Sequence, residues 1–314
     1  MAVYAGVDEA GYGPMLGPLV VGCAALDSER PEAELWQDLA SVVHLSADRW
    51  DGLVVQDSKL LFRRASGIRR LEEGCLSFAG SATGRRPETL GDLLRSLNAP
   101  FSLDSYPWYE LAEAMPVPLA ADPARIDEFS SALTSAIGSA KVRIAMLRAQ
   151  PVFSGMFNDE VAGGKSKSDV VFQRVVAHVR ALLESTTGDI FLTCDKLGGR
   201  NHYAAMLHHS FGAWVNILRE GHTSSHYSME LQGRSVHISF VQDGEREAPT
   251  VALASMFSKY LRELFLHLLN NYWCERVHGL TPTSGYVQDA RRFIGSIDGH
   301  PDYEKYQPLL VRLK

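Results

Sequence analysis

The sequence predicts an α/β fold, in which a central mixed β-sheet is flanked by helices. The first observation is that short apolar runs typical of strands alternate along the chain with longer segments that carry apolar residues at helical spacing. The second is size and composition. With 314 residues, of which 46% are hydrophobic, the chain can bury a full core, and its length allows one large domain or two smaller ones.

The N-terminal part begins with two predicted strands, over residues 2–9 and 18–26, which are joined by a turn rich in glycine and proline. A helix should begin at Asp57 or Ser58, because either side chain can accept a hydrogen bond from the first helical turn. Residues 74–123 are rich in Gly, Ser and Pro and predict an irregular segment.

The middle of the chain carries the clearest helix signal. Asp122 is a capping residue, Pro123 suits the first helical position, and apolar residues recur at helical spacing as far as Leu147. The aromatic run at 106–109 is interpreted as a packed loop rather than a substrate platform. A further helix is expected to follow the Gly-rich stretch before residue 165, with Ser168 as its cap.

The second half again alternates strands and helices. It predicts strands over 189–194, within VNILREG and over 235–241, a helix from Asn201, and a long helix from Pro249 to about Tyr272. The first and last of these strands are followed closely by aspartates, Asp195 and Asp243. No internal repeat or low-complexity tract is evident.

Four acids follow strand-like runs, and these are the candidate catalytic residues. Asp8 and Glu9 end the first strand, and Asp195 and Asp243 follow two later ones. An acidic pair in a turn is more often structural than catalytic, but carboxylates that converge from different strands form a site that no local segment could make. Their mutual repulsion is relieved by divalent cations such as Mg²⁺, which prefer oxygen ligands. The pattern predicts metal-assisted phosphodiester chemistry, in which two metals activate water and stabilise the leaving oxygen.

Other site classes are excluded by spacing. The eleven histidines show no HExxH or other zinc spacing. The GGKS at 163–166 lacks the earlier glycine of a phosphate-binding loop, so a nucleotide hydrolase at this position is rejected. Four cysteines without a CxxC motif predict free thiols in a reducing compartment. Without a signal peptide or an apolar run of membrane length, we expect a cytoplasmic protein with no membrane partner.

The charge balance constrains the partner. A net charge of −6 and a pI near 6 are unusual for a nucleic-acid binder. The predicted acidic site accounts for part of the deficit, because a bound metal would neutralise it. Basic residues cluster locally, although any single pair is more simply explained as a solvated face. We therefore expect modest, salt-sensitive affinity for nucleic acid.

Five sequence blocks resemble one family. DEAGYGPMLGPLVV, from Asp8, closely resembles the DEAGRGPLxGPVVV signature of the type 2 ribonucleases H (ribonuclease HII). Four further blocks follow in the family's order and extend the resemblance to about half of the chain, residues 1–62 and 165–295. The first of these is Asp57-Ser58-Lys59, which matches DSK, and the second is the strand that ends at Asp195. The third runs from Asp243 through Ser255, Lys259 and Arg262, and it is similar to an acid followed by a short spacer and AASxxAKxxRD. The fourth is SGYVQDARRFI from Ser284, which is similar to SGYPxDPxTxxFL.

The resemblance implies a ribonuclease H-like fold and a metal-dependent endonuclease. Such an enzyme hydrolyses the RNA strand of RNA·DNA hybrids, or cuts at ribonucleotides embedded in duplex DNA, and leaves 3′-hydroxyl and 5′-phosphate ends. The implied ligands of Mg²⁺ or Mn²⁺ are Asp8, Glu9, Asp195 and Asp243. The implied substrate contacts are Gly11, Tyr12 and Gly13 at the ribose, Tyr286 stacked on the sugar next to the scissile bond, and Lys59, Ser255 and Lys259 on phosphates. The expected partner is an RNA·DNA hybrid duplex, and a monomer is favoured.

Three features depart from the family's pattern. Tyr12 stands where the family has arginine, which removes a cation and five donors from the loop that reads the ribose. Residues 63–165 form a longer segment than the family needs, and Val287 replaces its usual proline. Two alternatives therefore stay open: a nuclease of the same fold that acts on another structured nucleic acid, and a non-catalytic nucleic-acid-binding module.

The expected domain organisation follows from these blocks. A ribonuclease H-like catalytic domain spans 1–272 and contains an insertion at about 63–165. A C-terminal substrate-binding extension, 273–314, packs on this domain and is helical. The terminal PLLVRLK is expected to dock on the catalytic domain rather than to serve as a clamp-binding tail.

Overall fold

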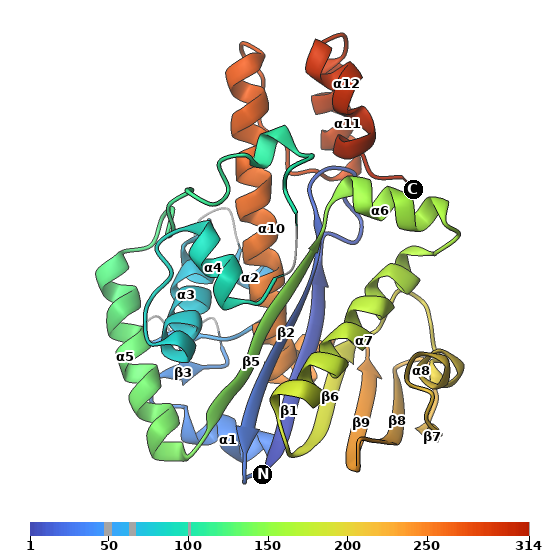
Figure 1. The fold of residues 1–314 in the computed structure, drawn as a ribbon. Coiled ribbons are helices and arrows are strands. Elements are labelled where there is room, and N and C mark those ends of the chain that lie inside the picture. Colours follow the sequence, from blue (N-terminus) through green and yellow to red (C-terminus); the bar gives the residue numbers. More distant parts are fainter. Residues whose placement is uncertain (47–51, 63–66, 100–101, 314) are drawn as a thin grey trace.

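The computed structural model describes residues 1–46, 52–62, 67–99 and 102–313. In this part of the chain, seven strands form one central sheet with helices on both faces (Figure 1). The strands of this sheet, in the order in which they neighbour one another, are β5 (Arg143–Val152), β2 (Leu19–Ser28), β1 (Ala2–Ala10), β6 (Asp189–Asp195), β9 (Arg234–Val241), β8 (Ser224–Leu231) and β7 (Asn216–Arg219). A small second sheet pairs β3 (Val43–His44) with β4 (Leu53–Val54).

Strand direction changes across the sheet. β1, β2 and β5 are antiparallel neighbours, as are β7, β8 and β9. Between these groups, β1, β6 and β9 run parallel to one another. The carboxyl ends of these three strands therefore meet at one edge of the sheet. The predicted α/β class with a central mixed sheet, as expected of a ribonuclease H-like fold, is confirmed.

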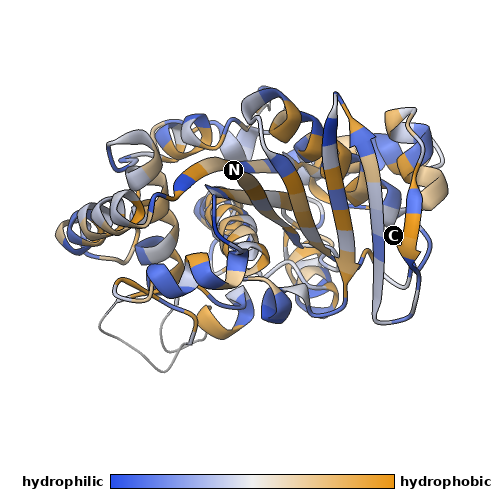
Figure 2. Cartoon of the chain, turned by 90° about the horizontal axis from the view of Figure 1, so that it is seen from below, coloured by the Kyte–Doolittle hydropathy of each residue, from blue (hydrophilic) through white to orange (hydrophobic). Residues whose placement is uncertain are grey.

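The helices divide between the two faces of the sheet. The long α10 (Pro249–Arg276) packs on β1 and β2, and α7 (Lys167–Ser185) packs on β2 and β5 from the other side. Apolar residues recur along the strands between the two helical layers, as the hydropathy colouring in Figure 2 shows. The remaining helices are α1 (Glu32–Asp38), α2 (Ser58–Leu61), α3 (Arg69–Thr83), α4 (Leu90–Ser96), the 3-10 turn η1 (Pro107–Tyr109), α5 (Pro123–Ala140), α6 (Ser154–Ala162), α8 (Ala204–Phe211), α9 (Gly244–Glu247), α11 (Val287–Ile297) and α12 (Pro301–Leu310).

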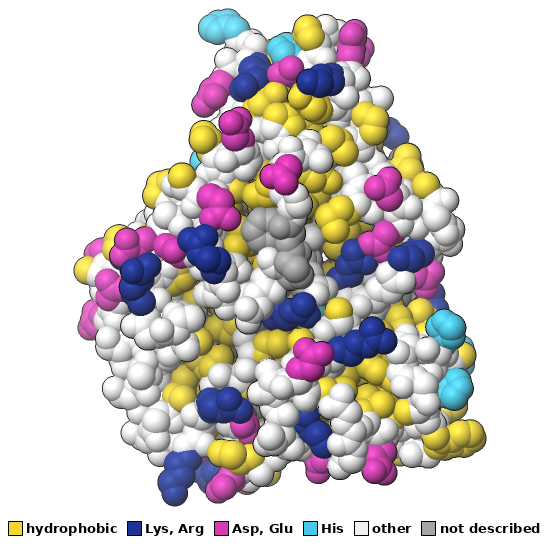
Figure 3. Space-filling view, viewed as in Figure 1, with side chains coloured by type: hydrophobic (Ala, Val, Ile, Leu, Met, Phe, Trp, Pro, Cys, Tyr) yellow, Lys and Arg dark blue, Asp and Glu magenta, His cyan; other side chains and the backbone are white. Residues whose placement is uncertain are grey.

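Charged side chains lie mostly at the surface. On the face seen in Figure 3, lysine and arginine side chains are interspersed with acidic ones. None of the described helices combines the length and the apolar character needed to cross a membrane. All four cysteines are free thiols, as predicted.

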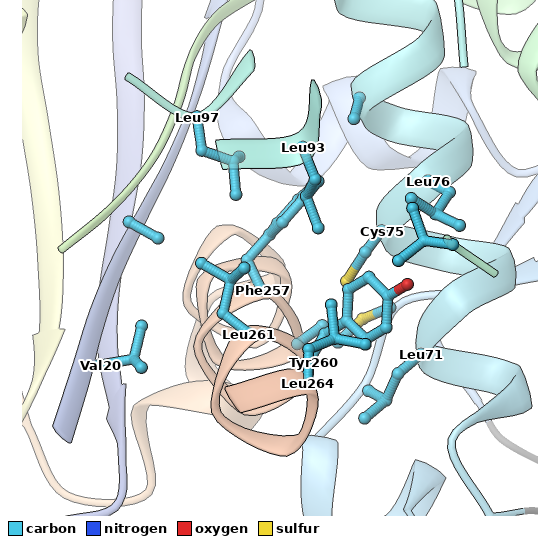
Figure 4. Packing of buried hydrophobic residues seen from close by; sticks show 14 of the residues in the cluster. Val20, Leu71, Cys75, Leu76, Leu93, Leu97, Phe257, Tyr260, Leu261 and Leu264 are labelled. Carbon is cyan, nitrogen blue, oxygen red and sulfur yellow. The ribbon is translucent and has the colours of Figure 1, made fainter. Parts of the chain in front are cut away.

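Helix α10 is buried on most of its circumference because it lies between the sheet and the helices of segment 69–140. Figure 4 shows its side chains between β2 on one side and α3 and α4 on the other. The residues labelled there are Phe257, Tyr260, Leu261 and Leu264 of α10, together with Val20, Leu71, Cys75, Leu76, Leu93 and Leu97 from the surrounding elements. Burial on this scale fixes the position of α10 on the sheet.

Two glycines allow α10 to approach the sheet at backbone distance. A Cβ on Gly6 would lie 2.1 Å from the backbone of Thr250 and Val251. A Cβ on Gly22, the partner of Asp8 on β2, would lie 2.4 Å from the Ser258 hydroxyl. Only glycine fits at such points. The helix is thereby brought directly against the strand that ends at the acidic pair.

The predicted insertion, residues 63–165, contains more regular structure than expected. The helix predicted to reach Leu147 ends at Ala140, because Lys141 adopts a left-handed conformation with φ 54°. Ile144 and Leu147 belong to β5, an edge strand of the central sheet, so their helical spacing was misleading. The prediction of an irregular segment over 74–123 is also wrong, since α3 continues to Thr83 and α4 follows.

Helix starts were predicted more closely. Asp57 caps α2 by accepting a hydrogen bond from Lys59 N, and Asp122 caps α5 in the same way. The cap of α7 is Ser166 rather than Ser168, because Asp169 completes a capping box with it. The aromatic run at 106–109 is buried, which confirms a packed loop.

The C-terminal tail docks as predicted. Leu16 forms an isolated β-bridge with Val311, and Arg312 N donates to Met15 O at 2.9 Å. The side chain of Asn158 on α6 donates to Val311 O at 2.8 Å. The tail after α12 therefore lies against the loop that follows β1.

Candidate active site

Four acidic side chains lie at the edge where β1, β6 and β9 end. Asp8 and Glu9 are near the end of β1, and Asp195 is the last residue of its neighbour β6. Glu245 lies in α9, the short helix that follows β9. Segments far apart in the sequence thus bring four carboxylates to one place, because parallel strands end at the same edge.

Asp8 is the most deeply buried of these acids, with 6% of its surface exposed. Burial raises its pKa well above the usual range, and the charges of Glu9 and Glu245 raise it further. A hydrogen bond with Ser255 acts in the opposite direction. On α10, Ser258 donates to the backbone oxygen of Asp8 at 3.0 Å, which fixes the strand end.

Glu9 and Asp195 repel each other across the strand ends. Burial raises the pKa of Glu9 to about 7, with Asp195 as the next cause, while Lys59 lowers it. Burial also raises the pKa of Asp195, although the backbone N–H of Gly244 donates to its Oδ1 at 3.0 Å and lowers it. A cluster with raised pKa values attracts protons or cations.

Glu245 is held by polar groups from two helices. Ser255 Oγ on α10 donates to Glu245 Oε1 at 2.6 Å, and Lys59 Nζ on α2 lies 3.9 Å from Glu245 Oε2. Burial raises the pKa of Glu245, and both partners lower it. Ser58 Oγ lies 2.9 Å from Ser255 Oγ, so the hydroxyls form a chain behind the carboxylates.

Asp243 takes a different position from the one that the sequence suggested. Its side chain is exposed, and it adopts a left-handed conformation with φ 54° before α9. Its charge raises the pKa of Asp195 less than burial does. The carboxylate that packs with Asp8, Glu9 and Asp195 is that of Glu245. A signal was present, since Glu245 lies four residues before Pro249, where the helix that carries Ser255 begins.

Lys59 is a basic residue that lies close to the acids. Its side chain is 79% exposed, and its backbone N–H donates to the capping carboxylate of Asp57 at 2.8 Å. Partial burial lowers its pKa, but the charges of Glu245 and Asp57 outweigh this and raise it. Lys59 therefore remains charged and accessible beside the cluster.

Two other predicted phosphate contacts are much less exposed than Lys59. Ser255 is only 2% exposed and is engaged with Glu245. Lys259 Nζ donates to Glu263 Oε1 at 2.7 Å and lies 4.4 Å from the centre of the Phe62 ring. The position of Lys259 fits a helix pair better than a phosphate contact.

The glycine-rich loop and the predicted C-terminal tyrosine are both partly open to solvent. Tyr12 is half-buried, and burial and then the charge of Glu9 raise its pKa. Gly13 is exposed, and a Cβ there would have no neighbour within 4 Å. Tyr286 is 54% exposed. Gly11, with φ +93°, lies close to the side chain of Arg262, which also lies under Tyr286.

The donor set suits a hard cation. All four side chains offer carboxylate oxygens, which Mg²⁺ and Mn²⁺ prefer. In this structure, the described residues include no group of three or more histidine, cysteine or acidic side chains that is close enough together to hold a metal ion. Burial nevertheless raises the pKa values of Asp8, Glu9, Asp195 and Glu245, and the charge of Lys59 offsets only part of this effect for Glu9, Asp195 and Glu245.

Comparison with known proteins gave structural likenesses only. No family model matches the chain, and no curated protein matches it. The RNase HII of Archaeoglobus fulgidus, in a complex with PCNA, is 14% identical, with 99% of this chain and 94% of that chain covered and a TM-score of 0.44. The ribonuclease H2 of Pyrococcus horikoshii OT3 is 16% identical, with 98% of this chain and 92% of that chain covered and a TM-score of 0.45. Bst-RNase HIII in complex with Mn²⁺ is 13% identical, with 99% of this chain and 66% of that chain covered and a TM-score of 0.43. At these identities and TM-scores, the likeness does not establish an activity.

Proposed function

We propose that this protein is a metal-dependent endonuclease that hydrolyses the RNA strand of RNA·DNA hybrids or cuts at ribonucleotides embedded in duplex DNA. The observation that carries the proposal is the convergence of Asp8, Glu9, Asp195 and Glu245 at one sheet edge. Four neighbouring carboxylates are costly for a fold. A cluster of this kind is typical of a site that works with bound cations.

The four acids would hold Mg²⁺ or Mn²⁺, which when bound would supply an activated water and stabilise the leaving oxygen, to give 3′-hydroxyl and 5′-phosphate ends. The chain's own groups orient the acids. Ser255 holds Glu245, and Gly244 N–H holds Asp195. In this proposal Ser255 is a positioning residue rather than a phosphate contact, and Glu245 takes the role that the sequence assigned to Asp243.

Substrate contacts would come from the accessible groups around the acids. Gly11, Tyr12 and Gly13 would face the ribose, where backbone groups can read the 2′-hydroxyl that separates RNA from DNA. Tyr286, which is 54% exposed, would stack on the neighbouring sugar. Lys59, with its side chain 79% exposed, would contact a phosphate.

The test uses two labelled duplexes, one with a single ribonucleotide embedded in DNA and one a full RNA·DNA hybrid. Each is incubated with the protein and Mg²⁺ or Mn²⁺, and Asp195→Asn serves as the inactive control. Cleavage of either duplex that is lost in the variant supports the proposal. Cleavage of the hybrid alone would mean that Tyr12 does not support recognition of a single ribonucleotide.

If neither duplex is cut with either metal, the proposal fails, and a panel of other structured nucleic acids tests the nuclease alternative. Calorimetric titration with Mn²⁺ then separates the remaining possibilities. Metal binding that disappears in Asp195→Asn indicates a nuclease with another substrate. The absence of any acid-dependent metal binding indicates a non-catalytic binding module.

A further inference from the structure

The loop over residues 11–18, which joins β1 to β2, is held from two sides by backbone hydrogen bonds. On one side, Gly285 O accepts from Met15 N at 2.8 Å and from Leu16 N at 3.2 Å. On the other side, Met15 O accepts from Arg312 N at 2.9 Å. The loop thus lies between the turn that precedes α11 and the C-terminal tail.

Arg262, on α10, lies beneath the start of this loop. It is 1% exposed, and its Nη2 donates to Ser284 O at 3.0 Å. A Cβ on Gly11 would lie 3.0 Å from its Cδ and Nε atoms. Its Cζ lies 5.6 Å from the centre of the Tyr286 ring. The side chain of Arg262 therefore lies beside both Gly11 and the Tyr286 ring.

Arg312 is a second buried arginine, at the other end of the loop. It is 4% exposed, its Nη2 donates to Pro14 O, and its Cζ lies 5.3 Å from the centre of the Phe157 ring. Its Nε, like that of Arg262, has no hydrogen-bond partner among the described residues. Burial lowers its pKa to about 9, and the charge of Arg262 adds to this effect.

Buried arginines are unfavourable if packing is their only role, and this applies most strongly to Arg312. A buried charge without a close counter-ion destabilises a fold, and an apolar residue of similar volume usually serves as well or better. Among the described residues, Arg262 shares the carboxylate of Glu263 with Lys259, whereas no acidic side chain lies within ion-pair distance of Arg312. What the guanidinium groups add is directed hydrogen bonds to Ser284 O and Pro14 O.

We propose that Arg262 and Arg312 are positioning residues that hold loop 11–18 and Tyr286 together as one substrate-facing unit. The substrate-facing part of this inference rests on the proposed nuclease function. The claim that the two arginines hold the loop does not depend on that function, and it can be tested without any substrate.

The tail that carries Arg312 is anchored independently. Asn158 on α6 donates to Val311 O at 2.8 Å and accepts from Leu313 N at 2.7 Å. Ser154 Oγ donates to Leu310 O at 3.1 Å. Replacement of the Arg312 side chain should therefore loosen the loop without releasing the tail.

The first experiment measures amide hydrogen exchange in the full chain. In Arg312→Met and Arg262→Met, we expect the amides of Met15 and Leu16 to exchange about tenfold faster or more than in the wild type, and Arg312→Lys to recover part of the protection. Arg234→Met is the matched control, because Arg234 also donates to backbone oxygens, those of Gly188 and Leu183, but at the far end of the sheet. Unchanged exchange at Met15 and Leu16 would overturn the inference.

The second experiment measures steady-state cleavage of the duplex with an embedded ribonucleotide. We expect Arg312→Met to raise KM about tenfold with kcat within about threefold, and its unfolding temperature to stay within about 3 °C of the wild type. A fall in kcat with unchanged KM would overturn the substrate-facing role. If the wild type cuts neither duplex, the proposed function fails, while the exchange rates still decide whether the arginines hold the loop.

Discussion

Glu245 completes the set of four carboxylates, and its two oxygens are engaged by Ser255 and Lys59. Asp243 is exposed, and its charge adds to the raised pKa of Asp195. We therefore expect Glu245→Gln to lower kcat by about 100-fold and Asp243→Asn by less than about threefold. Steady-state cleavage assays check this. A larger loss in the Asp243 variant would contradict the assignment.

Glu9 gives a prediction that needs no substrate. Its pKa is raised from 4.5 to about 7 in the folded protein, so the folded state holds a proton more tightly than the unfolded state. Stability from this group is present below pH 4.5 and is lost as pH rises to 7. Without metal, Glu9→Gln should be more stable than the wild type at pH 8 by about 1–3 kcal/mol, and equal at pH 4.

Urea unfolding in the presence of a chelator, at several pH values, measures this difference. Glu9 is partly exposed, which keeps the expected gain below the full value of the shift. Added Mg²⁺ should stabilise the wild type more than the variant, because the carboxylate is one of the proposed ligands. If the wild type and Glu9→Gln were equally stable at pH 8, with and without metal, the charge of Glu9 would not destabilise the folded protein.

At the scale of elements, the contact between α10 and β1 decides where the site residues lie. A Cβ on Gly6 would lie 2.1 Å from the backbone of Thr250 and Val251. Gly6→Ala should therefore displace α10 and destabilise the protein by about 3 kcal/mol. Gly138→Ala in α5 is the matched control, because a Cβ there meets nothing within 4 Å and alanine favours a helix. Denaturant unfolding should separate the two variants, and a neutral Gly6→Ala would refute the close approach.

Strands and long helices with strong local signals were predictable. The sequence indicated β1, β2, β6 and β9, together with the start of α10, because period and caps agree in these segments. It missed β8, and it read the start of β5 as helix because Ile144 and Leu147 continue a helical spacing by coincidence. These residues form a strand because they pair with β2, and such pairing between distant segments is not encoded in the local periodicity.

The site was predictable where it is tied to strand ends. Asp8, Glu9 and Asp195 were predicted at strand ends, and the structure places them there. Glu245 was not, because the number of residues between the end of β9 and the start of α10 does not show which acid turns inward. That choice follows from the left-handed backbone at Asp243, which leaves its side chain exposed, and from the Ser255 hydroxyl, which binds Glu245.

At the scale of the whole molecule, the negative net charge determines how we expect the protein to bind a polyanion. The net charge is −6, and basic and acidic side chains are mixed on the face in Figure 3. If the protein binds a duplex as proposed, association would depend on a few local cations and on metal at the acids, rather than on a general positive field. Lys59 is an accessible cation beside the four acids.

We therefore expect Lys59→Ala to weaken duplex binding at every sequence and to lower the slope of log affinity against log salt by about one unit, the value for one phosphate contact. Lys141→Ala is the control, since Lys141 is exposed at the end of α5, far along the chain and outside the cluster. Binding is measured with the Asp195→Asn variant in Mg²⁺, so that cleavage does not interfere. Because Lys59 also neutralises Glu245 and Glu9, its loss should weaken binding more when metal is absent. A salt slope that is unchanged in Lys59→Ala but reduced in Lys141→Ala would place the duplex on another face of the molecule.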